Sequence, residues 1–251
     1  MRRLFIASVA LAALAASPVL SQDDPMPASI ESAVADATRP EADRQLDANR
    51  HPAEVLLFAG LEPGWRVADL AAGSGYYSRV LSTAVGSDGH VYTMNPTWVA
   101  ERFAETDAGL AAFAGERPNM THFSSTIETF GEHVGTEPLD AVFMVLFYHD
   151  TGWDGTDRVA MNAEAFDSLR PGGVFVVIDH HAVEGTGLDV VESLHRIDEA
   201  SVIAEVTAAG FELDASSDML ANAEDSREIS PFDPSIRRQT DRFVLRFRKP
   251  D

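Results

Sequence analysis

Residues 67–78 read Val67-Ala68-Asp69-Leu70-Ala71-Ala72-Gly73-Ser74-Gly75-Tyr76-Tyr77-Ser78. An apolar run ends at Leu70, small residues and two glycines follow at once, and residues 76–85 then carry a helical pattern. This order predicts a strand, a tight turn and a helix, which together open a βαβ unit. Glycines at positions 73 and 75 allow positive φ angles and let a ligand approach the main chain, while the free N–H groups of the helix face that ligand. We therefore expect a ligand site at this turn.

The glycine spacing separates two classes of ligand that use such a turn. A dinucleotide fingerprint, G-x-G-x-x-G, would have a glycine at position 78, where this chain has Ser78. The pattern Asp69-x-x-x-Gly73-x-Gly75 instead resembles the first motif of class I S-adenosylmethionine-dependent methyltransferases. In that family the turn lies against the methionine part of the cofactor, and the acidic residue helps to hold its amino group. An ordinary βα turn of another α/β protein is the alternative.

The chain is strongly acidic, with 40 acidic and 19 basic residues and a formal net charge of −21. Such a surface repels nucleic acid and anionic membranes over most of its area. We therefore expect a small-molecule substrate and no nucleic-acid partner. The length of 251 residues, of which 45% are hydrophobic, suits one globular α/β domain with a full core.

The N-terminus has the features of an export signal. Arg2 and Arg3 precede an apolar stretch over 4–16 that is short for a membrane span, and Val19-Leu20-Ser21 fits a cleavage site. We predict a signal peptide at 1–21, a linker with N-terminal cap helices at 22–50 and a methyltransferase-like domain at 51–251. The chain has no cysteine, which excludes disulfides and thiolate chemistry. These features predict an exported, periplasmic bacterial protein, with an uncleaved membrane anchor as the alternative.

The rest of the chain alternates predicted strands with predicted helices. We expect strands at 90–94, 120–124, 139–148, 174–178, 211–215 and 243–247, and helices at 53–60, 76–85, 97–114, 158–169 and within 190–210. The run at 139–148 is apolar without alternation, which favours a central strand covered on both faces. Leu169-Arg170-Pro171-Gly172-Gly173, before a hydrophobic strand, resembles a late motif of the same methyltransferase family.

Together the two motifs imply a Rossmann-like class I methyltransferase fold. Its sheet would have seven strands, mostly parallel, with helices on both faces and an antiparallel C-terminal hairpin. Three further segments resemble a bacterial group of exported, predicted methyltransferases: Gly75-Tyr76-Tyr77, His195-Arg196-Ile197-Asp198 and Asp241-Arg242-Phe243-Val244. The resemblance covers residues 53–249.

The resemblance also implies a set of cofactor-binding residues for S-adenosylmethionine. They are Asp69, Ala71, Gly73, Gly75, Tyr76, Asn95, Ser124, Ser125, Phe147 and Tyr148. In the family, the second strand ends in an acidic side chain that holds both ribose hydroxyls. Here Asn95 stands at that place, and an amide can bond a hydroxyl but lacks the strength of a charged acceptor. Ser124 and Ser125 stand where the family contacts adenine; capping the next helix is their alternative role.

Candidate catalytic residues follow the fourth and fifth predicted strands. His149, Asp150 and His180 should lie beyond the carboxyl ends of these strands, in the same crevice as the glycine turn. A neutral imidazole can take a proton near pH 7, so His149 is the predicted general base. A polar loop cap is the alternative for His149, and a role at a metal is the alternative for Asp150. His180 and His181 point to opposite sides of an extended chain, so at most one belongs to the site.

Three functions are consistent with these residues. The first is transfer of a methyl group from S-adenosylmethionine to a small oxygen, nitrogen or sulfur nucleophile. The second is an exported protein that binds a small molecule on the same fold without catalysis. The third is a metal-dependent hydrolase that uses His149, Asp150 and Asp179.

Overall fold

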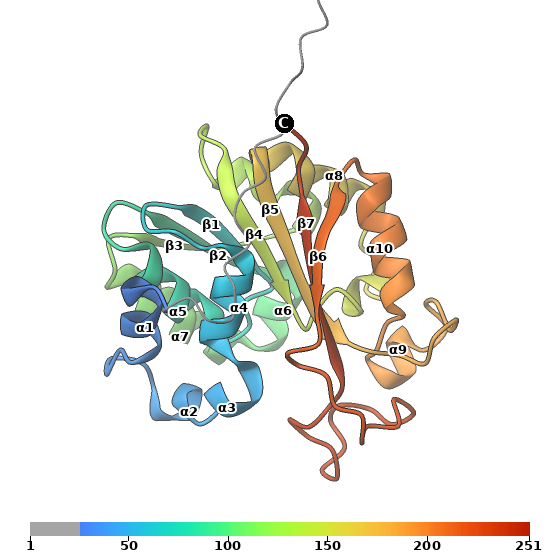
Figure 1. Ribbon diagram of the computed structural model, residues 1–251. Coiled ribbons are helices and arrows are strands. Elements are labelled where there is room, and N and C mark those ends of the chain that lie inside the picture. Colours follow the sequence, from blue (N-terminus) through green and yellow to red (C-terminus); the bar gives the residue numbers. More distant parts are fainter. Residues whose placement is uncertain (1–25) are drawn as a thin grey trace, which may run out of the picture.

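The computed structural model describes residues 26–251, and the predicted signal peptide at 1–21 lies outside them. At its centre is a seven-stranded sheet in the order β3-β2-β1-β4-β5-β7-β6 (Figure 1). The strands are β1 (Arg66–Leu70), β2 (His90–Pro96), β3 (Met120–Ser125), β4 (Leu139–Val145), β5 (Leu169–His180), β6 (Glu212–Ser217) and β7 (Arg242–Arg248). β7 runs antiparallel to β5 and β6, whereas the other neighbours pair in parallel. The predicted sheet and its C-terminal hairpin are confirmed.

Helices cover both faces of the sheet. They are α1 (Ala28–Val34), α2 (Glu41–Arg44), α3 (Asp47–Arg50), α4 (Pro52–Ala59), α5 (Tyr76–Val85), α6 (Thr97–Arg102), α7 (Ala104–Gly115), α8 (Arg158–Ser168), α9 (Val191–Leu194) and α10 (Glu199–Ala208), with 3-10 helices η1 (Ile127–His133) and η2 (Asp150–Gly152). α1, α4 and α5 form one core with strand residues such as Val67, and α8, α10 and η1 form the other with residues such as Ala68. Within residues 26–251, none of these helices is long and apolar enough to cross a membrane.

β4 is the predicted central strand, and side chains from 141 to 144 alternate between the two cores without exposure to solvent. The strand is shorter than the predicted 139–148, because it ends at Val145. Leu146 adopts a φ of 57°, which no strand tolerates, and its N–H donates to the Ile178 carbonyl at 2.7 Å. Residues 147–150 therefore turn away from the sheet as a loop.

Two predicted helices are divided in the structure. The segment 97–114 breaks at Phe103, which leaves the helical region with φ −121° and ψ 47° and separates α6 from α7. The segment 190–210 contains the short α9 and then α10. Asp198 begins α10 by accepting a hydrogen bond from the Ala200 N–H at 3.2 Å. Residues 22–50, predicted as a linker with N-terminal cap helices, contain α1, α2 and α3 in their described part.

The loops that carry the predicted site residues lie at one edge of the sheet, beyond the carboxyl ends of its parallel strands. β1, β4 and β5 are parallel neighbours, so their carboxyl ends lie together. β7 is antiparallel, and its first residue, Arg242, pairs with His180 at the end of β5. The loop at 219–241, which precedes β7, therefore reaches the same edge as the turn after β1. Figure 1 shows this loop, α2 and α3 below the sheet.

Candidate active site

In the turn after β1, Ala71, Gly73 and Gly75 adopt the left-handed region, with φ angles of 54°, 58° and 84°. At Gly73 a side chain would meet no atom of the described residues within 4 Å, so the main chain there is open on one side. At Gly75 a side chain would overlap Leu110 of α7 and lie 2.9 Å from the guanidinium of Arg79. The turn is thus closed by its own chain at Gly75 and accessible over residues 71–74.

Asn95 fastens this turn to the end of β2. Its Oδ1 accepts a hydrogen bond from the Gly73 N–H at 2.8 Å, and its Nδ2 donates to the Gly73 carbonyl at 3.1 Å. The second Nδ2 hydrogen goes to Asp107 of α7 at 2.9 Å, and Asn95 is buried. Both amide hydrogens are therefore engaged within the protein. Asp107 also accepts a hydrogen bond from His122 Nε2 at 3.0 Å, on the same oxygen.

Asp69 lies buried at the end of β1. Its Oδ2 accepts a 2.5 Å hydrogen bond from the Ser78 hydroxyl, which also lies 2.8 Å from the Thr93 hydroxyl. Burial raises the pKa of Asp69 to about 6, since these bonds only partly offset the loss of solvent. At neutral pH this carboxylate is therefore charged but poorly solvated, and a cationic ligand would stabilise it.

The raised pKa predicts a pH-dependent stability. The folded protein holds the Asp69 proton up to about pH 6, and the unfolded chain releases it near its ordinary value of 3.8. Protonation of Asp69 therefore adds about 3 kcal/mol to the free energy of unfolding below pH 4. This stabilisation decreases as pH rises toward 6 and is lost above pH 6. Asp69→Asn should then gain stability over the wild type at pH 7 and little at pH 4. Urea denaturation at both pH values measures this, and an equal difference at the two values would contradict it.

Two of the predicted cofactor residues, Tyr76 and Tyr148, use their hydroxyl groups in hydrogen bonds to other parts of the protein. The Tyr76 hydroxyl donates to Asp47 at 2.6 Å, and the guanidinium of Arg50 lies 4.4 Å from the Tyr76 ring centre. Tyr76 therefore supports the N-terminal helices, and its backbone remains at the turn. Tyr148 is fully buried, and its hydroxyl donates to Glu205 of α10 at 3.0 Å and accepts from Asn162 of α8. Neither phenol is available to a ligand.

The other predicted cofactor residues lie at the expected edge. Ser124 pairs with Asn95 in the β2–β3 register, and Ser125 lies 3.0 Å from the Thr129 hydroxyl. Neither serine caps the following 3-10 helix, whose first flanking residue is Thr126. Phe147 is buried in one of the two cores, and its ring centre lies 6.1 Å from that of Trp98. Trp98 and Ala71 both pack against the same core.

His149 is the best-organised of the predicted catalytic residues. Its Nδ1–H donates to Asp179 Oδ1 at 2.7 Å, and its backbone N–H donates to Asp179 Oδ2 at 2.7 Å. Both side chains are buried. Burial alone would lower the pKa of His149, but the Asp179 carboxylate, with a smaller contribution from Asp150, raises it above its ordinary value. Asp179 thereby fixes the ring and directs Nε2 toward Asp150.

Asp150 links His149 to a residue that sequence reasoning did not assign to the site. Its Oδ1 lies 3.4 Å from His149 Nε2 and 3.0 Å from His195 Nδ1, and it accepts a hydrogen bond from the Trp153 indole at 2.9 Å. His195 follows α9 with a φ of 51°. Its one signal in the sequence is the resemblance of the His195–Asp198 segment to a bacterial group of methyltransferases, which implies no role for this histidine.

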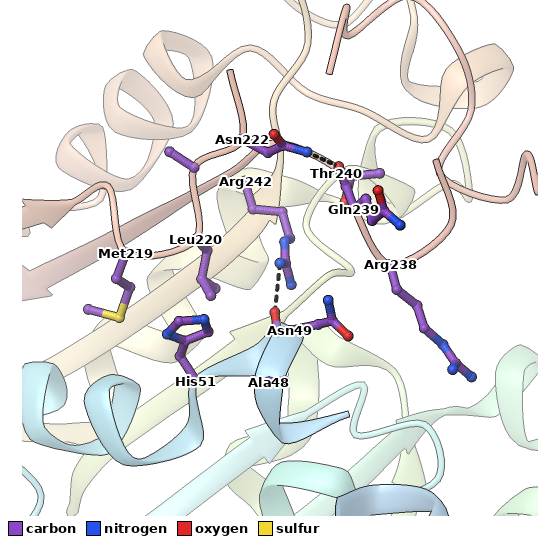
Figure 2. Close-up of a pocket in the computed structure, with 11 residues that line it drawn as sticks. Ala48, Asn49, His51, Met219, Leu220, Asn222, Arg238, Gln239, Thr240 and Arg242 are labelled. Carbon is purple, nitrogen blue, oxygen red and sulfur yellow. Dashed lines mark hydrogen bonds between the residues drawn. The ribbon is translucent and has the colours of Figure 1, made fainter. Parts of the chain in front are cut away.

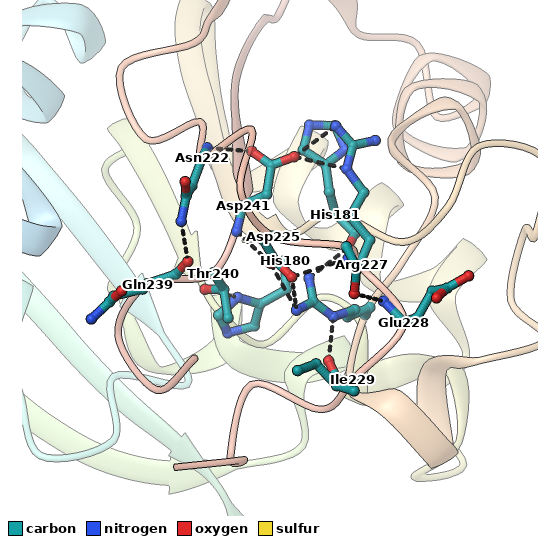
Figure 3. Close-up of polar contacts among 12 residues, drawn as sticks. His180, His181, Asn222, Asp225, Arg227, Glu228, Ile229, Gln239, Thr240 and Asp241 are labelled. Carbon is teal, nitrogen blue, oxygen red and sulfur yellow. Dashed lines mark hydrogen bonds and ion pairs between the residues drawn. The ribbon is translucent and has the colours of Figure 1, made fainter. Parts of the chain in front are cut away.

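The position of His195 depends on the residue after it. Arg196 is fully buried and donates to both oxygens of Asp225, at 3.0 and 2.8 Å. Asp225 belongs to the 219–241 loop, which Figure 3 shows held by further contacts between Arg227 and Asp241. One buried ion pair, Arg196–Asp225, therefore ties this loop to the segment after α9, and the Arg227–Asp241 pair is internal to the loop.

His180 lies between this cluster and a cavity. Its ring centre is 5.9 Å from that of His149, and its Nδ1 is 2.9 Å from the Thr240 hydroxyl. Burial lowers the pKa of His180 well below its ordinary value, and His149 adds to the effect, so this ring is neutral. The cavity, of about 190 Å³, lies between α3 and the 219–241 loop, with Thr240 and Arg242 in its wall (Figure 2). His181 points elsewhere, toward Glu199 at 3.7 Å.

Solved structures resemble this chain in fold, although no protein-family model and no curated protein matches its sequence. A SAM-dependent methyltransferase from Aquifex aeolicus is 18% identical, with 84% of this chain and 98% of that chain covered and a TM-score of 0.55. Aeropyrum pernix fibrillarin, solved with natively bound S-adenosyl-L-methionine, is 16% identical, with 80% and 76% covered and a TM-score of 0.53. The cyclase SpnF is 18% identical, with 88% and 91% covered and a TM-score of 0.58. The likeness shows the predicted Rossmann-like methyltransferase fold, and the activity has to be argued from the site.

Proposed function

We propose that this protein transfers a methyl group from S-adenosylmethionine to a small-molecule acceptor. The observation that carries the proposal is the accessible main chain over 71–74, which lies beside Asp69 and at the same sheet edge as His149. Solved proteins of this fold include methyltransferases, and one of them holds S-adenosyl-L-methionine. The acidic surface favours a small acceptor over a nucleic acid.

The residues at the turn fit the methionine part of this cofactor. Gly73 leaves open space for a ligand at the main chain, and the poorly solvated carboxylate of Asp69 favours a cation nearby. At the place where the ribose of the cofactor would lie, the side-chain amide of Asn95 is already bonded to Gly73 of the turn. The carboxylate next to Asn95 is that of Asp107. Among the described residues nothing donates a hydrogen bond to Asp107 Oδ2, so this oxygen could accept from a hydroxyl.

His149, Asp150 and His180 are proposed to face the acceptor. When bound, S-adenosylmethionine supplies an electrophilic methyl group, and its transfer depends mainly on how the acceptor is positioned. Asp179 holds His149 by Nδ1, which leaves Nε2 as the atom that can take a proton from the acceptor. The assignment of His149 as a general base stays a prediction. The cavity lined by Thr240, whose hydroxyl lies 2.9 Å from His180 Nδ1, is one space that could hold a small acceptor.

A matched pair of glycine variants tests the cofactor site. Gly73→Ala adds a methyl group on the open side of the turn, so we expect affinity for S-adenosylmethionine to fall at least about tenfold. Gly60→Ala is the control, because Gly60 also has a positive φ, of 73°, and also has no described atom within 4 Å of the added carbon. Isothermal titration measures both. Equal affinities in the two variants would place the cofactor elsewhere or exclude it.

We also propose that the protein is exported, because residues 1–21 have the charge and hydropathy of a signal peptide. The mature chain would begin at Gln22. The intact mass of the protein recovered from its native cells decides this, and a mass that includes residues 1–21 would contradict it.

A further inference from the structure

Potential metal ligands from two separate segments come together here: His149 and Asp150 after β4, and His195 after α9. One nitrogen or oxygen atom from each lies within 4.8 Å of the other two. The distances to Asp150 Oδ1 are 3.4 Å from His149 Nε2 and 3.0 Å from His195 Nδ1. Two ligands that bind one ion at about 2.1 Å, at octahedral or tetrahedral angles, are themselves about 3.0–3.4 Å apart. We propose that these three residues bind one divalent transition-metal ion.

The surroundings of His149 are those of a metal ligand. A ligating histidine commonly donates its other ring N–H to a carboxylate, which fixes the tautomer and the ring orientation. Here Asp179 is fully buried and accepts from His149 Nδ1 at 2.7 Å. Asp179 is itself held by the backbone N–H groups of His149 and His180, each at 2.7 Å. The ring therefore cannot turn without breaking a buried network.

The contact between His149 and Asp150 has room for a shared cation. With Nδ1–H donated to Asp179, Nε2 of His149 faces Asp150 Oδ1 at 3.4 Å. Either a metal ion or a proton on Nε2 can be shared by these two atoms. The experiment below separates the two cases.

The ligand set selects the class of metal. Two imidazoles and one carboxylate suit first-row transition metals such as Zn²⁺, Fe²⁺ or Co²⁺, whereas Mg²⁺ and Ca²⁺ prefer sites made of oxygen atoms. Three protein ligands leave coordination positions free. The side chains of Asp150 and His195 are 16% and 26% exposed, so solvent and a small ligand can reach them. The exposed rings of Trp153 and Phe232 flank His195, with centres 6.0 and 4.9 Å from its own.

This inference does not depend on methyl transfer, but it bears on the role of His149. A single lone pair on Nε2 serves either as a base or as a metal ligand. With an ion bound, its open coordination positions would be the place that holds the oxygen, nitrogen or sulfur atom of an acceptor. The metal titration is made without S-adenosylmethionine, so its result is separate from that of the cofactor titration.

The test is titration of the chelator-treated protein with Zn²⁺ and with Co²⁺, each alone. We expect one ion per chain with micromolar or tighter affinity, and visible absorption bands from bound Co²⁺ that show nitrogen ligands. His195→Ala should weaken binding on the order of 100-fold or more, and Asp179→Asn by roughly 10- to 100-fold. His195 is partly exposed, so this variant should fold even if a change at the buried His149 does not.

His90→Ala is the control for metal bound at an unrelated histidine. His90 begins β2 at the opposite edge of the sheet, and its ring hydrogen-bonds only the Thr121 hydroxyl among the described residues. Unchanged binding in His90→Ala together with loss in His195→Ala supports the proposal. Absence of saturable binding in the wild type would overturn it and favour a proton on His149. Equal affinity in His195→Ala and the wild type would also overturn it.

Discussion

Replacing Arg196 with alanine is expected to lower the free energy of unfolding by about 3–5 kcal/mol. Arg196 and Asp225 are both fully buried, and the guanidinium donates to both carboxylate oxygens. It also donates to the carbonyls of Ile229 and His181, each at 2.9 Å. Without it, Asp225 stays buried with no counter-charge and two carbonyls lose their donor. Urea denaturation of the variant measures the loss.

Arg44→Ala is the control for this prediction. Arg44 forms an ion pair with Glu41 at 2.6 Å, but both side chains are exposed. Solvent screens such a pair, so the variant should be almost as stable as the wild type. If Arg196→Ala were equally harmless, the 219–241 loop would not be fastened by the buried pair, and the position of His195 would need another explanation.

Gly75→Ala is expected to destabilise the protein by about 2–5 kcal/mol. Part of this arises because a residue other than glycine in the left-handed region costs about 1–2 kcal/mol, and Gly75 has a φ of 84°. The remainder, about 1–3 kcal/mol, is the cost of inserting an atom against the buried side chain of Leu110 and 2.9 Å from Arg79. Thermal and urea unfolding of the variant give the value.

Gly60→Ala again provides the comparison. It adds the same methyl group at a similar φ, of 73°, where no described atom is within 4 Å. We expect it to lose only about 1–2 kcal/mol, the conformational part alone. Equal losses at Gly60 and Gly75 would mean that Leu110 does not close the turn from that side.

Most of the fold could be predicted from local patterns. The glycine turn, the apolar run of β4 and the Pro171-Gly172-Gly173 turn each have a strong signal within a few residues. The end of β4 was predicted wrongly, because 146–148 is as apolar as the strand itself and nothing in those residues announces the positive φ of Leu146. The break at Phe103 had no signal either, since neither glycine nor proline stands near it in the helix.

The site was predictable only where its residues follow strands. His149, Asp150 and His180 come together as expected, because parallel strands bring their carboxyl ends to one edge. His195 lies 45 residues beyond Asp150, and the spacing of residues in the sequence does not predict their contact in the fold. The bonds of Asn95 to Gly73 and to Asp107, and the use of Tyr148 between α8 and α10, depend on side-chain packing across elements. Sequence patterns carry no information on such contacts.

The accessible main chain at Gly73 is the feature on which the proposed function depends. Isothermal titration of the wild-type protein with S-adenosylmethionine at pH 7, where Asp69 is charged, tests it most directly. We predict saturable binding of one molecule per chain with a dissociation constant of roughly 1–100 μM. Absence of binding at high micromolar cofactor would contradict the account, provided that a cooperative thermal unfolding transition shows the protein to be folded.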